Sequence, residues 1–154
     1  MILEYMKINA IALIINGLVF LLLLICSVDD IHKKTIHLKK LIIFMIPIVI
    51  GTLIRTDIGI IQCITGMIVG VLFIVISKVT RGAIGMGDGL LLCVTGLGLG
   101  IWRNLEMLCY ALLFAAIYSS ILLIRNFRNR KRKIPFVPFL FLGYICCILL
   151  GGII

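Results

Sequence analysis

Apolar runs long enough to cross a membrane recur along the chain, with short polar stretches between them. A helix that crosses the hydrocarbon core of a bilayer needs about 20 mainly apolar residues. Of the 154 residues, 63% are hydrophobic and 14% are charged, whereas an ordinary soluble domain is about half apolar and about a quarter charged. A chain of this length cannot bury so much apolar surface in one aqueous core. The sequence therefore predicts a membrane protein with a single domain over residues 1–154.

Six apolar segments are candidate transmembrane helices, so the expected fold class is an all-α membrane protein. The second and fourth segments are short, and re-entrant or interfacial placement is the alternative for them. Lys39, Lys40 and Arg55 flank the second segment, and their long side chains can reach the membrane interface. The six segments are residues 8–28, 41–54, 58–76, 89–102, 107–124 and 138–154.

The distribution of positive charge decides whether the two short segments cross. If all six segments cross, one side of the membrane holds 12 of the 15 Lys and Arg residues. Omitting either short segment alone would place the basic run 125–133 opposite the basic residues of 33–40. Because Lys and Arg collect in cytoplasmic loops, we expect six transmembrane helices with both termini on the non-cytoplasmic side.

The net charge of +9 then reflects topology rather than nucleic-acid binding. The run 125–133 is expected to be a solvated cytoplasmic loop that attracts anionic lipid, with an acidic protein partner as the alternative. Asp29 and Asp30 follow the first apolar run in place of a small-residue cleavage pattern, so we expect this helix to be retained.

The six cysteines lie within or at the edge of apolar segments, without the paired short spacings of zinc sites. We expect them to act as small buried hydrophobic residues, with no disulfide and no metal site. They are Cys26, Cys63, Cys93, Cys109, Cys146 and Cys147.

Two acidic residues at helix ends are the candidates for chemistry. Asp30 follows the first predicted crossing and Asp88 follows the third, so both lie on the same side of the membrane. Two nearby carboxyl groups can share one proton, since two like charges do not easily coexist. The ionised member can then activate a water while the protonated member polarises a peptide carbonyl. The alternative is that each carboxylate only caps a helix end.

Glycines surround the second of these residues in the sequence Gly85-Met86-Gly87-Asp88-Gly89. Glycine permits close approach of another backbone, which favours a bent segment that admits a peptide substrate. The alternative is ordinary helix packing, because membrane helices use small residues at their contacts.

Three motifs together resemble the type IV prepilin peptidases, which are GxGD intramembrane aspartic peptidases. GMGD at residues 85–88 is similar to the GxGD motif and opens an apolar helix. Asp30 is followed six residues later by Ile36, where the family has Ile-Pro. IPFVPFL at residues 134–140 is similar to the family signature IPFGPFL. The resemblance covers nearly the whole chain in order.

The resemblance implies an aspartic endopeptidase that removes the leader peptide of type IV prepilin-like substrates at the cytoplasmic face of a prokaryotic cell membrane. It makes Asp30 and Asp88 the catalytic pair, with Gly85 and Gly87 shaping the substrate-binding backbone. It implies no metal, no organic cofactor and no nucleic-acid partner. Longer members carry a cytoplasmic insert with paired cysteines and also methylate the new N-terminus. Because this chain has no such insert, we expect peptidase activity without N-methylation.

Three departures from the family pattern leave other functions open. His37 replaces the proline after Ile36, Val137 replaces a glycine, and Leu90 stands where a lysine is common. Arg81 is a candidate to supply the missing positive charge near Asp88. The alternatives are a non-catalytic prepilin-binding or secretion-complex subunit and a small proton-coupled transporter that uses its acidic residues as a relay.

Overall fold

The computed structural model describes residues 2–33, 38–54, 60–80, 85–125 and 135–151. In this part of the chain every regular element is an α-helix, which confirms the expected all-α class. The helices are α1 (Ile2–Lys33), α2 (Leu38–Ile54), α3 (Ile60–Val79), α4 (Met86–Arg125) and α5 (Val137–Gly151).

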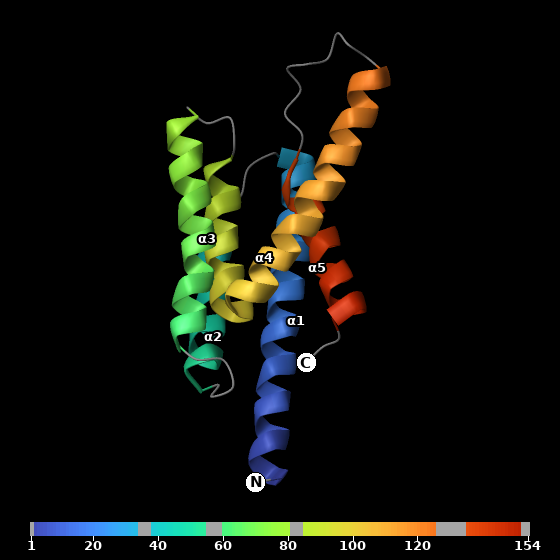
Figure 1. Cartoon of the computed structure of the whole chain (residues 1–154). Helices are drawn as coiled ribbons and strands as arrows, with labels where there is room; N and C mark the ends of the chain where they lie inside the picture. The colour runs from blue at the N-terminus through green and yellow to red at the C-terminus, as the bar shows by residue number, and fades with distance from the viewer. Residues whose placement is uncertain (1, 34–37, 55–59, 81–84, 126–134, 152–154) are drawn as a thin grey trace.

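The helices run alternately up and down in a bundle, and both termini lie at the same end (Figure 1). The fourth element consists of two helices joined across a bend at Gly100, where φ is 75° and ψ is 176°. A backbone in this region is essentially restricted to glycine. The chain reverses direction there, so residues 86–99 and 101–125 form two limbs of α4 (Figure 1).

Within the described part of the chain, three helices are long and apolar enough to cross a membrane, at Asn9–His32, Ile60–Val79 and Met86–Ile124. The last of these is 39 residues long and contains both limbs of α4. A shorter apolar helix covers Val137–Leu150. The prediction of a helical membrane protein is therefore supported by the long helices, whereas six separate crossings stay a prediction.

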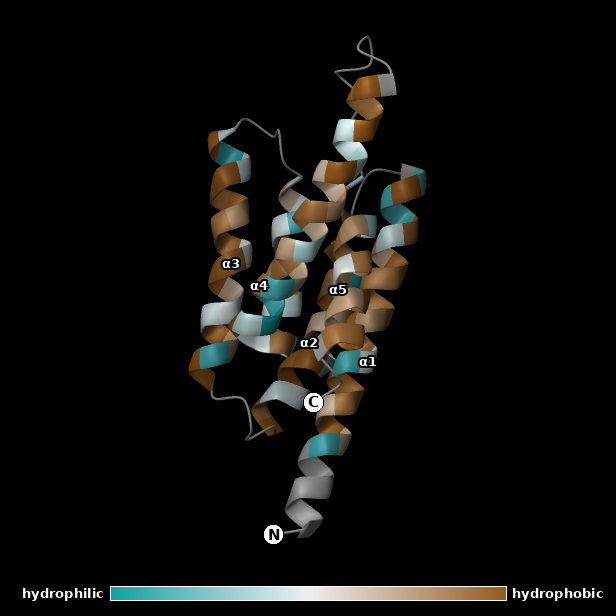
Figure 2. Ribbon diagram, turned by 45° about the vertical axis from the view of Figure 1, so that its right-hand side comes forward, coloured by the Kyte–Doolittle hydropathy of each residue, from teal (hydrophilic) through white to brown (hydrophobic). Residues whose placement is uncertain are grey.

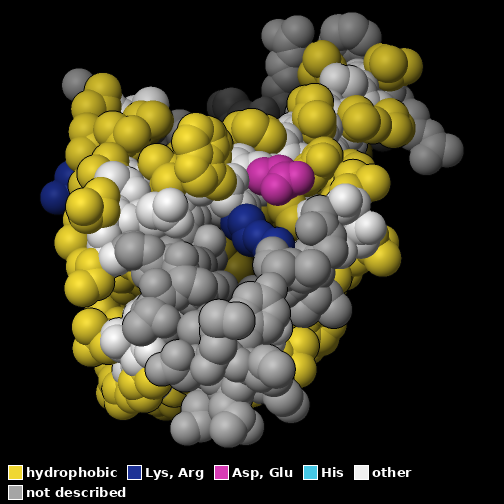
Figure 3. All heavy atoms as spheres, turned by 60° about the horizontal axis from the view of Figure 1, so that its bottom comes forward, with side chains coloured by type: hydrophobic (Ala, Val, Ile, Leu, Met, Phe, Trp, Pro, Cys, Tyr) yellow, Lys and Arg dark blue, Asp and Glu magenta, His cyan; other side chains and the backbone are white. Residues whose placement is uncertain are grey.

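Hydrophobic side chains also cover the outside of the bundle, as expected for a protein surrounded by lipid. Ile61, Leu53 and Trp102 are 77%, 68% and 74% exposed. Hydrophobic residues follow the helices along most of their length, with hydrophilic residues near the helix ends and in the bend of α4 (Figure 2). Figure 3 shows the bundle turned so that the lower end of Figure 1 comes forward. The described surface in this view is mainly hydrophobic, with acidic side-chain atoms beside basic ones.

Several helix boundaries differ from those expected. The first helix continues through Asp30 to Lys33, and the fourth begins at Met86, so both candidate acidic residues lie inside helices. The predicted break between segments 89–102 and 107–124 is wrong in its position: residues 101–106 are helical, and α4 bends at Gly100 instead. The predicted break between segments 41–54 and 58–76 lies outside the described residues.

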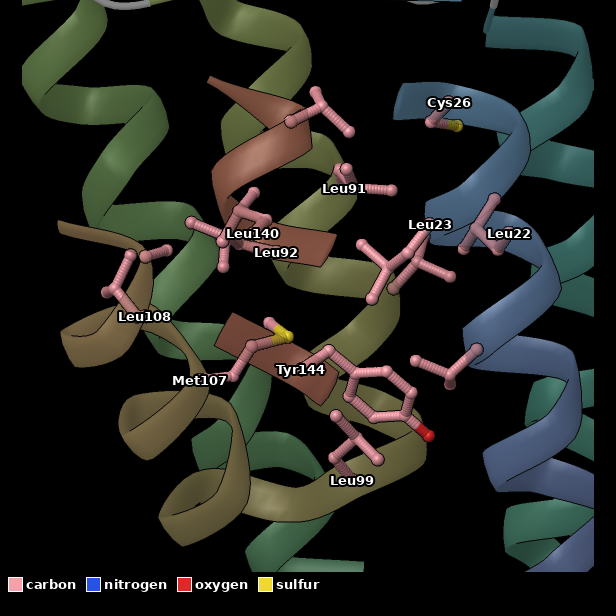
Figure 4. Packing of buried hydrophobic residues seen from close by; sticks show 14 of the residues in the cluster. Leu22, Leu23, Cys26, Leu91, Leu92, Leu99, Met107, Leu108, Leu140 and Tyr144 are labelled. Atoms are coloured by element: carbon pink, nitrogen blue, oxygen red, sulfur yellow. The ribbon is translucent and has the colours of Figure 1, made fainter. Parts of the chain in front are cut away.

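Side chains of α1, α4 and α5 form the centre of the core (Figure 4). Leu22, Leu23 and Leu92 are fully buried there, together with Leu140 from the last helix. Cys26, Cys63, Cys93 and Cys147 are buried as expected, whereas Cys109 is exposed.

The third helix packs against the first limb of α4 with backbone almost touching backbone. A Cβ atom added at Gly66 would lie 2.4 Å from the carbonyl oxygen of Gly96, and one added at Gly70 would lie 2.3 Å from the backbone nitrogen of Cys93. Small residues allow such close packing between membrane helices. The contact fixes the first limb of α4, and with it Asp88, against α3.

Candidate active site

The carboxyl group of Asp30 is buried near the end of α1, where the side chain is only 7% exposed. The backbone N–H of Val137, the first residue of α5, donates a hydrogen bond to its Oδ2 atom at 3.2 Å. The first N–H groups of a helix have no partner within the helix, and a carboxylate is a favourable acceptor for them. Asp30 therefore caps α5 from a position 107 residues earlier in the chain.

The carboxyl group of Asp88 is buried in the first turn of α4, with 8% of the residue exposed. Its backbone N–H donates to the carbonyl oxygen of Gly85 at 3.1 Å, which closes this first turn. A Cβ atom added at Gly85 would lie 2.9 Å from Oδ2 of Asp88. Glycine thus lets the chain before the helix lie directly against the carboxyl group. Gly87, the other glycine of the motif, is partly exposed.

The two carboxyl groups come from distant parts of the sequence and lie close enough for the charge of Asp30 to act on Asp88. The neighbouring Asp29 is placed differently, because its carboxylate forms a salt bridge with Lys40 at the start of α2. The side chains of that pair are 18% and 39% exposed, respectively. The structure therefore separates a partly exposed, charge-paired Asp29 from a buried Asp30.

Two of the three residues that differ from the family pattern, Val137 and Leu90, lie in the apolar core or pack against it. Val137 is fully buried while its backbone N–H contacts Asp30. Leu90 is partly buried and packs against the core. The rings of Phe136 and Phe73 stack with centroids 6.4 Å apart, which joins the start of α5 to α3. The third departure, His37, and the candidate charge Arg81 lie outside the described residues.

The sequence reasoning missed a buried polar cluster further along α4. Asn104 and Thr95 are both fully buried and hydrogen-bonded to each other. Asn104 lies in the gap between the predicted segments 89–102 and 107–124, and the sequence pattern assigned it no role. Asn104 follows Gly100 by four residues, and this spacing does not indicate that the side chain is buried.

The arrangement suits acid–base chemistry by two carboxyl groups in a site that is largely shielded from water. A general base must be able to contact the water that it deprotonates, and a second acid can polarise the group under attack. Among the described residues, no group of three or more His, Cys, Asp and Glu side chains is placed to hold a metal ion. Fold and site together define a helical membrane protein with a pair of buried carboxyl groups on separate helices.

Comparison with known proteins identifies the family. The model of the type IV leader peptidase family matches residues 17–124, and the chain belongs to this family. It is also similar to a protein of Bacillus subtilis (strain 168) described as "Prepilin leader peptidase/N-methyltransferase", with 30% identity over 131 residues. That match covers 84% of this chain and 53% of the relative, so the chain spans about half the relative's length. No solved structure matches the chain.

Proposed function

We propose that this protein is an intramembrane aspartic endopeptidase that cleaves the leader peptide of type IV prepilin-like substrates. Membership of the leader peptidase family supports a role in leader-peptide removal. The observation that carries the aspartic mechanism is the pairing of two buried carboxyl groups, from Asp30 on α1 and Asp88 on α4, at one site.

In the proposed reaction the two carboxyl groups share one proton, because two adjacent negative charges in a shielded site repel each other. The ionised carboxylate takes a proton from a water molecule, which attacks the carbonyl carbon of the scissile peptide bond. The protonated carboxyl group donates a hydrogen bond to the carbonyl oxygen as negative charge develops there. Gly85 is exposed and Gly87 is partly exposed, so their backbone offers a surface without side chains on which an extended substrate backbone can lie.

We further propose six membrane crossings, with the active site at the cytoplasmic face of the cell membrane. The reversal of α4 at Gly100 supports this number, because its two limbs would cross in opposite directions between α3 and α5. Asp30, Asp88 and the basic residues Lys39, Lys40 and Lys78 belong to the helix ends opposite the termini (Figure 1). Cytoplasmic enrichment of Lys and Arg supports this orientation, and these residues also favour contact with anionic lipid.

The proposed activity is cleavage without methylation of the new N-terminus. None of the six cysteines in the sequence forms a CxxC pair, which supports this proposal. The methyltransferase named for the Bacillus subtilis relative is therefore not assigned to this chain.

Co-expression with a prepilin-like protein from the same host tests the proposal. The mass of the substrate is compared for the wild type, Asp30→Asn and Asp88→Asn, and membrane insertion of each variant is verified. We expect a mass loss of leader-peptide size with the wild type and none with either variant, because an amide cannot act as the base or share the proton. Asp29→Asn is the matched control and should retain cleavage, since Asp29 pairs with Lys40.

The outcomes separate the competing functions. Cleavage that survives Asp30→Asn or Asp88→Asn contradicts the proposed pair. Binding of the substrate without cleavage by the wild type favours a non-catalytic prepilin-binding subunit. Proton flux into vesicles that depends on Asp88, again without cleavage, favours a transporter.

A further inference from the structure

A single amide side chain joins three helical segments deep in the bundle. Asn104 is fully buried on the second limb of α4. Its Nδ2 group donates to the carbonyl oxygen of Leu92 at 3.1 Å and to that of Gly66 at 3.2 Å. Its Oδ1 atom accepts a hydrogen bond from the hydroxyl of Thr95 at 2.9 Å. The amide thus ties the second limb to the first limb of α4 and to α3.

The segments that Asn104 joins belong to two parts of the bundle, and each part carries one acidic residue of the site. Asp88 lies on the first limb of α4, which is fixed to α3 by the close contacts of Gly66 and Gly70. Asp30 lies on α1, which is tied to α5 through Val137. The second limb of α4 belongs to this latter part, because a Cβ atom added at Gly143 of α5 would lie 2.5 Å from the carbonyl oxygen of Met107.

The two limbs of α4 meet at Gly100, so the angle at this residue affects the distance between the two acidic residues. Asp88 lies 12 residues before Gly100, or about 18 Å along the helix axis at 1.5 Å per residue. A rotation of about 10° at the bend would therefore displace Asp88 by about 3 Å. Errors of about 1 Å in the position of a catalytic group can lower a rate by about a hundredfold.

Apolar packing across the bend is less directional than hydrogen bonding, because the hydrophobic effect has no preferred direction. Hydrogen bonds have a preferred geometry, and a satisfied buried polar network makes its surroundings rigid. Asn104 lies four residues after Gly100 and holds Leu92 and Thr95 on the other side of the bend. A Cβ atom added at Gly96 would lie 2.8 Å from the Nδ2 atom of Asn104, so the absence of a side chain at this position leaves room for the amide.

We propose that Asn104 is a positioning residue that fixes the bend of α4 at Gly100 and thereby sets the separation between Asp88 and Asp30. This role rests on the proposed peptidase function, because the separation of the two carboxyl groups matters for catalysis. The distance measurement that tests it requires no activity. Thr95 is the second member of the network, and it fixes the orientation of the amide.

Spin-label distances in the full chain, reconstituted in lipid nanodiscs, test the proposal without requiring activity. Labels are introduced at Val28 on α1 and Lys78 on α3 through unnatural amino acids, which leaves the six cysteines unchanged. Both positions are exposed, and they report on the parts that carry Asp30 and Asp88, respectively. The distance distribution is measured by pulsed electron paramagnetic resonance for the wild type and for Asn104→Leu, Thr95→Val and Tyr144→Phe.

We expect Asn104→Leu to broaden the distribution and shift it by a few Å, as estimated from the lever arm, and Thr95→Val to broaden it less. Tyr144→Phe is the matched control, because it removes another interior hydrogen bond, from the Tyr144 hydroxyl to the carbonyl oxygen of Asn16 at 2.8 Å. That bond joins α5 to α1, on one side of the bend, so this variant should keep the wild-type distribution.

Kinetics provide the second readout once cleavage is established. We expect kcat of Asn104→Leu to fall by about 10- to 100-fold with KM nearly unchanged, since misplacement of the carboxyl groups affects the chemical step. Wild-type distance distributions in both Asn104→Leu and Thr95→Val would overturn the proposal. If Asn104→Leu does not fold, the distance distribution of Thr95→Val tests the proposal. A wild-type distribution in that variant is then sufficient to reject the proposed role. A missing peptidase activity with shifted distances would instead refute only the proposed function.

Discussion

Replacing Gly70 by alanine tests the close backbone contact that holds Asp88 against α3. The added Cβ atom would lie 2.3 Å from the backbone nitrogen of Cys93 and 2.7 Å from the carbonyl oxygen of Gly89. Ordinary contact begins near 3.4 Å, so the two helices must separate by about 1 Å. Backbone atoms cannot rotate away as a side chain can, and overpacking of this kind costs about 1–3 kcal/mol.

The same substitution at Gly17 is the matched control. Gly17 lies within α1, and a Cβ atom added there would meet nothing within 4 Å. Alanine is favoured over glycine in a helix by up to about 1 kcal/mol, so Gly17→Ala should be neutral or slightly stabilising. We therefore expect the two variants to differ by about 1–3 kcal/mol, because the helix preference is common to both and only the steric clash remains.

Thermal unfolding of the purified protein in detergent, followed by its helical circular dichroism, measures this difference. For a chain of this size each kcal/mol corresponds to about 2–4 °C in Tm, so Gly70→Ala should melt roughly 2–12 °C below Gly17→Ala. Cleavage by Gly70→Ala should also fall, because Gly89 is adjacent to Asp88. A Tm of Gly70→Ala equal to or above that of Gly17→Ala would refute the close contact between α3 and α4.

Three further predictions use the same protein and assays. Asp29→Asn should lower stability by less than about 1 kcal/mol, because its salt bridge with Lys40 is partly exposed; a larger loss in thermal unfolding would mean that the pair has a structural role. Gly143→Ala should lower stability by about 1–3 kcal/mol through overpacking between α5 and α4, and a Tm at the wild-type value would contradict that contact. The mature substrate should lack a methyl group on its new N-terminal residue, and mass spectrometry that finds the methylated form would assign methyltransferase activity to this chain.

The existence of the helices could be predicted from the sequence because lipid imposes a simple rule on it. A helix in a bilayer satisfies its own backbone hydrogen bonds, so long apolar runs indicate helices reliably. The predicted segment 58–76 corresponds to α3 at Ile60–Val79, and segment 41–54 corresponds to α2 at Leu38–Ile54. The ends were less predictable: α1 continues past Asp30 because that carboxyl group is accommodated by a hydrogen bond from another helix.

The bend of α4 and the buried amide beyond it could not be predicted. Gly100 is one of 15 glycines, and the sequence does not show which of them adopts a positive φ. Asn104 appears polar and loop-like in the sequence, but in the fold its three hydrogen bonds are made by Gly66, Leu92 and Thr95. Burial of a polar side chain depends on partners that only the tertiary structure brings together.

The start of α5 explains in physical terms why the segment IPFVPFL accompanies the acidic residue on α1. Pro138 has no N–H group, and the N–H groups of Phe139 and Leu140 both donate to the carbonyl oxygen of Phe136, at 3.0 and 3.2 Å. The N–H of Val137 points instead to Asp30. Asp88 likewise lies in the first turn of its own helix, and a negative charge is stabilised near a helix N-terminus.

Both carboxyl groups therefore lie at the start of a helix. Asp88 lies in the first turn of its own helix, α4, whereas Asp30 lies at the start of α5, more than 100 residues later in the chain. Burial alone would penalise a charge at either position. The helix starts offset part of this penalty while leaving the two groups close to each other. The start of α5 therefore contributes to the site by orienting a backbone donor, and side chains there can vary, as at Val137, wherever the apolar core accepts them.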